Sequence, residues 1–125
     1  MDENQLSYAV IGAIIEVHKQ LGPGLLEHVY EEALAIELEI KQIPFERQCQ
    51  VPLRYKGRPL RGKLRVDLLI PGKLIVELKA VETMHEIFTA QLLTYLRLTN
   101  CKLGLLVNFN VTRAADGVNR VANNL

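Results

Sequence analysis

The sequence predicts an α/β fold in which a mixed β-sheet is flanked by helices, and three observations lead to this prediction. Apolar residues recur at helical spacing through the first 41 residues. After Pro44 the spacing changes to the alternation that is typical of strands. A further helical segment then precedes a nearly continuous apolar run, which indicates a strand buried on both faces. The expected order is α-α-β-β-β-α-β(-β), and the length of 125 residues favours a single domain, residues 1–125.

The first helix is predicted over residues 7–21, with Ser7 as its N-cap. Apolar residues spaced at i, i+4, i+7 and i+11 form one stripe along it: Val10, Ile14, Val17 and Leu21. Gly22 suits the left-handed conformation that often closes a helix. Pro23 cannot continue that helix but can begin another one. We therefore expect a break between two helices at this point.

A second helix is predicted near residues 25–41, and it has an acidic residue at its start. Glu27 falls in the first turn, where exposed backbone N–H groups and the helix dipole favour a carboxylate. From the local sequence this stabilising role is the preferred interpretation of Glu27. The alternative is that Glu27 belongs to a site whose other members lie elsewhere in the chain.

Strands and one more helix are predicted after the second helix. Alternation predicts strands over residues 49–56, 63–70 and 73–80, joined as an antiparallel meander or a pair of hairpins with a turn or loop at GRPLRG. Thr83 and Glu86 match a capping box that would open a helix over about residues 84–99. The expected stripe on that helix is Ile87, Gln91, Thr94, Tyr95 and Leu98. Residues 102–109 form the buried strand, and residues 111–125 fit either an edge strand or a last helical turn.

The composition excludes several classes of protein. The two cysteines, Cys49 and Cys101, lie far apart and outside any CxxC or Cys/His cluster, so neither a zinc site nor a disulfide framework is expected. The acidic start MDENQ argues against a signal peptide, and no apolar run is long enough to span a bilayer. We therefore expect a cytoplasmic protein without a membrane partner.

The net charge of +1 hides an uneven distribution of charge. Residues 1–46 carry nine acidic and two basic side chains, whereas residues 47–125 carry five acidic and thirteen basic ones. Six basic residues follow one another with no acidic residue among them: Arg54, Lys56, Arg58, Arg61, Lys63 and Arg65. Such a run can bind a polyanion by neutralising phosphates. From the charge alone, a solvated hairpin surface is the stronger interpretation.

Two acidic residues and one basic residue interrupt the predicted strands in the stretch VDLLIPGKLIVELK. Glu77 and Lys79 are two residues apart, so their side chains share one face of a strand. Counted back from the Pro71–Gly72 turn, Asp67 can lie near Glu77 and point the same way. Two close carboxylates repel unless a cation lies between them, and Mg²⁺ takes oxygen ligands of this kind. The alternative is a cross-strand salt-bridge patch, although polar residues in apolar strands slightly favour a site.

Three spaced motifs run through the chain. VDLLIPGKLIVELK reads D-x(9)-E-x-K, AQLLTYL reads Q-x-x-x-Y and GLLEHVY reads G-x-x-E-x-x-Y. Together with the phrases ERQ, YKG, IVELKAVE and LLVNF, they resemble the PD-(D/E)XK nuclease superfamily and, within it, the GxxExxY protein family, a mostly prokaryotic set of small proteins. The resemblance spans most of the chain in the right order, although Val66 stands where the superfamily often has a proline before the aspartate.

The resemblance implies a divalent-metal site. Asp67 and Glu77 would be the principal ligands of Mg²⁺ or Mn²⁺. The backbone carbonyl of Leu78 commonly joins such ligands, and an early helix of the superfamily often supplies a further acidic residue, a role that Glu27 fits. The glycines and proline before Glu27 would then set the angle at which its helix meets the sheet.

The resemblance also implies catalytic and supporting roles. Lys79 would be the catalytic lysine, and Gln91 would orient Lys79 or the attacking water. Tyr95 lies one turn further on the same helix face as Gln91. Tyr30 would support the site by packing beside Glu27. We expect Glu27, Asp67, Glu77 and Lys79 to converge in one pocket, with Gln91 and Tyr95 at its edge.

The sequence thus predicts a divalent-metal-dependent nuclease that hydrolyses phosphodiester bonds. Its partner would be nucleic acid, DNA in preference to RNA, bound through the basic run, and a homodimer is an arrangement that small nucleases cutting duplex often adopt. One rival hypothesis is a nucleic-acid-binding module that has lost catalysis. The other is a protein-interaction module that uses the same fold as a scaffold.

Overall fold

The computed structural model describes all residues, 1–125, as three α-helices, five strands and one short 3₁₀ helix. In chain order these are α1 (Glu3–Leu21), α2 (Glu27–Ile40), β1 (Glu46–Tyr55), β2 (Arg58–Ile70), β3 (Leu74–Lys79), α3 (Glu86–Thr99), β4 (Leu103–Asn108), η1 (Ala114–Gly117) and β5 (Val118–Ala122). The predicted order is confirmed, and the ambiguous C-terminal segment forms the last strand. None of the helices combines the length and apolar character that crossing a membrane requires.

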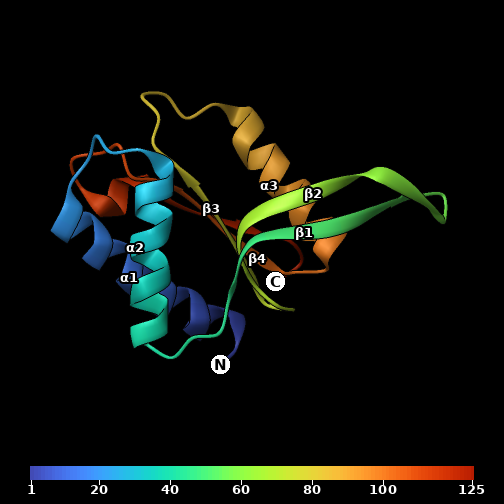
Figure 1. The fold of residues 1–125 in the computed structure, drawn as a ribbon, viewed down its shortest axis with the longest axis horizontal. Coiled ribbons are helices and arrows are strands. Elements are labelled where there is room, and N and C mark those ends of the chain that lie inside the picture. Colours follow the sequence, from blue (N-terminus) through green and yellow to red (C-terminus); the bar gives the residue numbers. More distant parts are fainter.

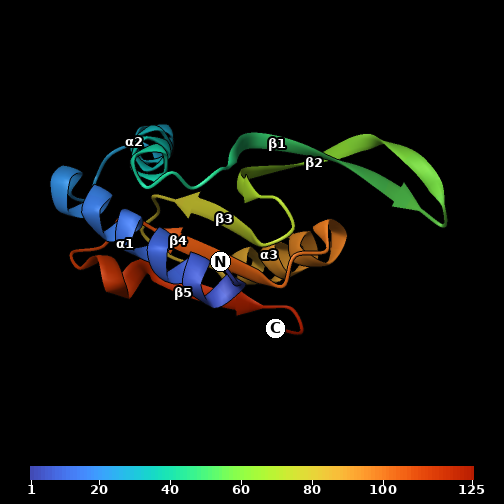
Figure 2. The same cartoon turned by 90° about the horizontal axis from the view of Figure 1, so that it is seen from below.

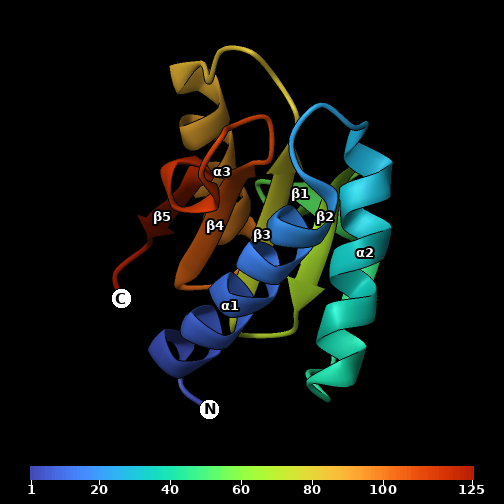
Figure 3. The ribbon, with the colours of Figure 1, turned by 90° about the vertical axis from the view of Figure 1, so that its left-hand side faces the viewer.

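The strands form one mixed sheet in the order β1-β2-β3-β4-β5. The β3–β4 pair is parallel, and the other three pairs are antiparallel. α1 and α2 cover one face of the sheet, and α3 covers the other (Figure 3). Every residue of β4 is buried, as predicted, because β4 lies between β3 and β5 and is covered on both faces.

Two apolar clusters fill the layers on either side of the sheet. The larger lies under α1 and α2, and β3 contributes Leu74, Val76 and Leu78 to it. The smaller lies under α3 and takes Ile75 from β3, so β3 alternates between the two layers. Because both faces of β3 are buried, a polar side chain on this strand must lie inside a covered layer.

Gly22 closes α1 as predicted, but both predicted N-terminal caps are wrong. α1 begins one turn earlier than expected, at a capping box between Asp2 and Gln5, and Ser7 is buried inside the helix. Leu6 is buried as well, so the apolar stripe continues N-terminal to Ser7 and extends the helix. α3 has His85 as its N-cap without a side-chain hydrogen bond, so the box predicted at Thr83 does not form.

The predicted stripe on α3 is also wrong. Leu92 and Leu96 are the buried residues of this helix, whereas Ile87 and Leu98 are exposed. Gln91 precedes Leu92 by one residue and is therefore rotated away from the core. The helix packs on the sheet through a face adjacent to the one that the sequence pattern suggested.

The β1–β2 hairpin is longer than predicted. The turn lies at Lys56–Gly57, where both residues are left-handed (φ 48° and 79°), so it includes only the first residue of GRPLRG, and the rest of that segment belongs to β2. A two-residue turn of this kind matches the twist of a hairpin. The hairpin projects beyond the body of the molecule and past α3 (Figures 1 and 2). We call residues 49–66 of this hairpin the arm.

Asn108, at the end of β4, ties together the loops that follow β3 and β4. Its side-chain amide exchanges hydrogen bonds with the N–H and carbonyl of Val81 (3.1 and 3.0 Å), and its oxygen also accepts from the N–H of Asn110 (3.1 Å). The next backbone N–H, of Phe109, donates to the carbonyl of Lys79 (2.9 Å). These contacts fix the end of β3.

Gly117 packs against the backbone of Asn108 so closely that no side chain fits. A Cβ at Gly117 would lie 2.0 Å from the Asn108 carbonyl oxygen. We expect Gly117→Ala to lower the free energy of unfolding by about 1–3 kcal/mol or more, since a backbone atom must move. Gly62→Ala is the control, because nothing lies within 4 Å of its Cβ position. Urea unfolding that finds the two variants equally stable would contradict this packing.

Candidate functional site

The candidate site begins where β2 and β3 separate. Their pairing runs from Ile70–Leu74 to Leu68–Val76 and ends there. Beyond that point the Leu78 N–H donates to the Asp67 carboxylate (2.8 Å). The aspartate side chain therefore occupies the place where a strand partner of β3 would otherwise lie.

β2 is irregular at Asp67. Val66 packs in the layer under α3, whereas Leu68 packs under α1 and α2, although residues two apart in a regular strand share a face. The opposing residue on β1, Gln48, is left-handed (φ 47°) and is skipped in the register between Arg47–Leu68 and Cys49–Val66. Asp67 thus sits where β2 passes from one layer to the other, and it contacts Gln48 on one side and Glu77 on the other.

Glu77 is a buried carboxyl beside Asp67. The Asp67 N–H donates to its carboxylate (3.4 Å), and a side-chain hydrogen bond joins the two acids. Burial, followed by the negative charge of Asp67, raises the pKa of Glu77 to about 9, while Lys79 opposes the shift. At neutral pH, Glu77 therefore carries a proton that hydrogen bonds to Asp67.

Lys79 and two residues of α3 lie on the same side as Glu77. The Lys79 Nζ lies 4.4 Å from the centre of the Phe88 ring, a cation–π contact. Burial and then the charges of Glu77 and Asp67 raise the pKa of Tyr95, and the side chain of Gln91 opposes this shift. Tyr95 therefore lies near the carboxyl pair, whereas Gln91, one turn earlier on α3, is exposed.

The other side of Asp67 opens into a cleft of about 240 Å³. Its lining residues come from α2 and the first two strands, with one from β3: Glu27, His28, Glu31, Gln48, Arg65, Asp67 and Leu78. Of the four residues expected in one pocket, Glu27 and Asp67 line this cleft, but Glu77 and Lys79 do not. Successive side chains on a strand point to opposite faces. Leu78 points to the α1–α2 layer, so its neighbours Glu77 and Lys79 point to the α3 layer and away from the cleft.

Three residues beside this cleft were missed in the sequence. Glu31 is buried on α2, one turn after Glu27, and forms a salt bridge with Arg47 (3.1 Å). The Gln48 side-chain amide donates both to Glu31 and to Asp67 (3.3 Å to the latter). The i+4 spacing from Glu27 was the available signal for Glu31. Arg47 and Gln48 lie in the phrase ERQ of the family resemblance, but nothing in the sequence indicated that they contact Glu31.

Tyr30 holds the loop that starts α2. Its buried hydroxyl donates to the Gly22 carbonyl (2.6 Å) and accepts from the Leu25 N–H (3.1 Å). Its ring stacks on Phe109, with centroids 4.3 Å apart. Gly22 is left-handed (φ 72°), which glycine allows. This loop places Glu27 in the first turn of α2, where the sequence predicted it.

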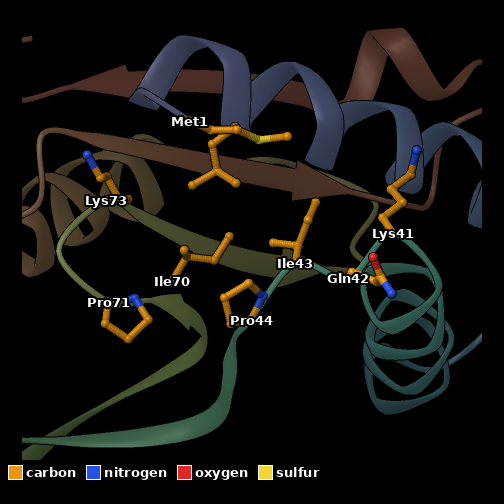
Figure 4. A pocket seen from close by; sticks show the side chains of 9 residues that line it. Met1, Lys41, Gln42, Ile43, Pro44, Ile70, Pro71 and Lys73 are labelled. Atoms are coloured by element: carbon orange, nitrogen blue, oxygen red, sulfur yellow. The ribbon is translucent and has the colours of Figure 1, made fainter.

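The six basic residues of the predicted run are all exposed, and none forms a salt bridge. Only Arg65 lines the cleft. The largest cavity, about 490 Å³, is separate and contains no acidic residue (Figure 4). It lies beside the β2–β3 turn and is lined by Met1, Leu6, Lys41, Gln42, Ile43, Pro44, Ile70, Pro71 and Lys73.

Asp67 and Glu77 are the donors that fit a divalent cation. Two adjacent carboxyls supply the oxygen ligands that Mg²⁺ prefers, and Mg²⁺ usually completes its shell with water. No group of three or more His, Cys, Asp or Glu side chains is assembled to hold a metal. Glu27, the third acid of the expected site, lies across the cleft on α2 and is not grouped with the other two.

Comparison with known proteins gives one match. A sequence model of the PD-(D/E)XK nuclease superfamily matches residues 4–121 of the chain. Searches among curated proteins and among solved structures found no match. The matched range includes every candidate residue described above.

The raised pKa of Glu77 predicts a pH-dependent stability. The folded protein keeps a proton on Glu77 between about pH 4.5 and pH 9, which the unfolded chain has lost, so this group lowers the free energy of unfolding as pH rises through that interval. We expect Glu77→Gln to remove this decline and to raise stability near pH 8 by on the order of 1–3 kcal/mol. Urea unfolding in EDTA at several pH values measures the effect. Parallel pH profiles for the parent and the variant would show that Glu77 titrates normally.

Proposed function

Because the chain belongs to the PD-(D/E)XK nuclease superfamily, we propose that it hydrolyses phosphodiester bonds of nucleic acid with the help of Mg²⁺ or Mn²⁺. One observation carries the proposal: the acids Asp67 and Glu77 lie together where β2 leaves β3, and Lys79 follows on the same face of β3. A carboxyl buried beside a second carboxylate, as Glu77 is beside Asp67, is unfavourable in a structural core. A divalent cation that displaces the proton would give the two carboxyls a functional role as its ligands.

We further propose that the protein is a member of the GxxExxY family. Gly24, Glu27 and Tyr30 supply the motif that names that family. In the structure Tyr30 anchors the loop and Glu27 opens into the cleft, so the motif residues have separate structural and chemical tasks. This division of tasks supports the assignment.

Asp67 and Glu77 would hold the cation, together with the Leu78 backbone carbonyl and water. A bound cation would neutralise charge on the phosphate and make a nearby water more acidic. Binding requires Glu77 to lose its proton, so it should be accompanied by proton release. Glu27 and its neighbour Glu31 face Asp67 across the cleft, where they would bind waters around the phosphate rather than the cation directly.

Lys79 would act on the phosphate and the attacking water. Its ammonium packs on Phe88 and has no salt-bridge partner, so its charge is available to a substrate. Held next to the carboxyl pair, it would stabilise negative charge that grows on a phosphate oxygen. Tyr95, which lies near the pair, and Gln91, one turn before it on α3, would orient the water by hydrogen bonds.

A second candidate function is a nucleic-acid-binding or protein-interaction module without catalysis. One observation favours it, since the acidic residues are not assembled around a common point. Metal binding separates the two functions. The nuclease should bind Mg²⁺ or Mn²⁺ and lose both binding and cleavage in Asp67→Ala, whereas a silent module would bind neither cation measurably in calorimetry.

Lys79 distinguishes a nuclease from a protein that merely binds a cation. We expect Lys79→Ala to leave Mg²⁺ affinity equal or tighter, because a like charge is removed, while cleavage falls by on the order of 10² or more. Lys79→Arg should restore little of the cleavage rate, because the guanidinium has a different shape and does not lose its proton. Calorimetry and single-turnover cleavage at saturating Mg²⁺ measure the two effects.

Lys73 provides the control for this experiment. It lies near the opposite end of β3, beside the separate cavity, so Lys73→Ala should cleave at the parent rate. If Lys79→Ala also cleaves at the parent rate, Lys79 has no catalytic role and serves only as a counter-charge for the carboxyls.

The exposed cations of the arm are proposed to bind phosphates. The logarithm of nucleic-acid affinity should then fall linearly with the logarithm of salt concentration, by about 0.9 for each phosphate that the arm neutralises on duplex. Replacing Arg58 and Arg61 by Ala should reduce this slope by about 0.9 for each phosphate that is no longer neutralised. The control is the double replacement of Arg97 and Arg113, which are exposed outside the arm. An equal change of slope in both double variants would mean that the arm contributes only net charge.

A further inference from the structure

The outer part of the arm, residues 54–63, is a free two-stranded ribbon, whereas the inner part packs against the cluster under α3 through Leu64 and Val66. β1 is the edge strand of the sheet, and β2 pairs with β3 only as far as Leu68. From Arg58 to Val66, therefore, β2 pairs with β1 alone, and both outer edges of the ribbon are unpaired. Figures 1 and 2 show the ribbon passing α3 and its outer part extending beyond the helices.

The surface of the arm combines positive charge with exposed apolar side chains. No acidic residue lies between Cys49 and Val66, and the six cations have no acidic partner. Near the turn, Tyr55 is 62% exposed and Leu60 is 49% exposed. Tyr55 is opposite Arg58 in the register. A tip that presents apolar groups beside cations suits a polyanion that also has an apolar surface, as nucleic-acid bases and sugars do.

The width of the ribbon points to one class of nucleic acid. Two strands lie about 5 Å apart, and with their side chains the ribbon is about 10 Å across. The major groove of B-form DNA is about 12 Å wide and admits a two-stranded ribbon. The corresponding groove of A-form RNA is deep and narrow and excludes it. A single strand offers no groove.

The arm also has a defined reach from the candidate site. Gln48, next to Asp67, and Tyr55 are seven residues apart on β1, which corresponds to about 23 Å along a strand. At about 3.4 Å per base pair, the tip lies about seven base pairs from the carboxyl pair. Arg65, which lines the cleft, marks the inner end of the same basic surface.

From these observations we propose that the arm enters the major groove of duplex DNA about seven base pairs from the cleavage position, with Tyr55 and Leu60 against base edges and the cations against phosphates. The proposal rests on the proposed function and names its substrate as duplex DNA. In this proposal Tyr55 and Leu60 contribute the part of the DNA affinity that does not depend on salt concentration, and the cations contribute the part that does.

The test measures binding in EDTA by fluorescence anisotropy, so it does not depend on cleavage. The probes are a DNA duplex, an RNA duplex and a DNA single strand, each of about 20 base pairs or nucleotides, and a short DNA duplex of about 5 base pairs closed by a hairpin loop, which spans about 17 Å. The parent chain is compared with the Tyr55→Ala, Leu60→Ala double variant. The control is Tyr8→Ala, since Tyr8 is 82% exposed on α1, away from the arm.

The parent should bind the longer DNA duplex most tightly, and the double variant should bind it about tenfold more weakly with an unchanged salt slope. The short duplex cannot reach from the cleft to the tip, so the affinities of the parent and the double variant for it should differ by less than about twofold. Tyr8→Ala should match the parent on every probe.

Four results would overturn the proposal. The parent could bind the single strand at least as tightly as the longer DNA duplex, or bind the RNA duplex as tightly as that DNA duplex. The double variant could bind all four probes more weakly by the same factor, or it could change its oligomeric state, which would make the tip an interface between copies. If the predicted binding pattern is found but Mg²⁺ and Mn²⁺ support no cleavage of duplex DNA, the proposed nuclease activity fails while the binding of the arm in the groove stands.

Discussion

The hydrogen bond from the Leu78 N–H to the Asp67 carboxylate is the interaction on which the rest of the structure depends. Regular pairing of β2 with β3 stops at Leu68 and Val76, and a buried N–H without a partner would destabilise the fold by about 1–3 kcal/mol. An aspartate at this position satisfies that group and lets the two strands separate. The separation in turn makes room for Glu77 beside Asp67 and releases β2 to continue as the arm. The acid that is central to the candidate chemistry is thus also required by the geometry of the sheet.

The two sides of Asp67 have different characters. Towards α3 lie the buried carboxyl of Glu77, a lysine on an aromatic ring and the half-buried Tyr95, a partly covered environment in which charges interact more strongly than in water. Towards α2 lies an open, mostly polar cleft. The side-chain amide of Gln48 donates hydrogen bonds both to Asp67 and to Glu31 in that cleft. Glu31 is also held by its salt bridge with Arg47. The orientation of the Asp67 carboxylate is therefore determined jointly by the β3 backbone and by a chain of contacts that ends on α2.

Sequence patterns predicted those features that depend on the spacing of residues along one segment. The order of the elements, the burial of β4 and the place of Glu27 in the first turn of α2 are of this kind. The exposed face of α3 was not predictable, because Ile87 and Leu98 are apolar and yet point to solvent, as single apolar side chains commonly do. Gln48 and Lys56 adopt left-handed conformations that glycine would have signalled but these residues do not. The contacts among Glu31, Arg47 and Gln48 join α2 to β1, so no periodicity within one element could reveal them.

The free edges of the arm have a consequence that does not involve nucleic acid. Two rows of unpaired backbone groups in an exposed ribbon are a template on which the strands of another molecule could add. Pro52 and Pro59, which lack an N–H, interrupt these rows, and the cations between them repel a second copy of the same ribbon. The charge on the arm thus opposes self-association of the protein, and this requirement by itself would maintain basic residues along both strands.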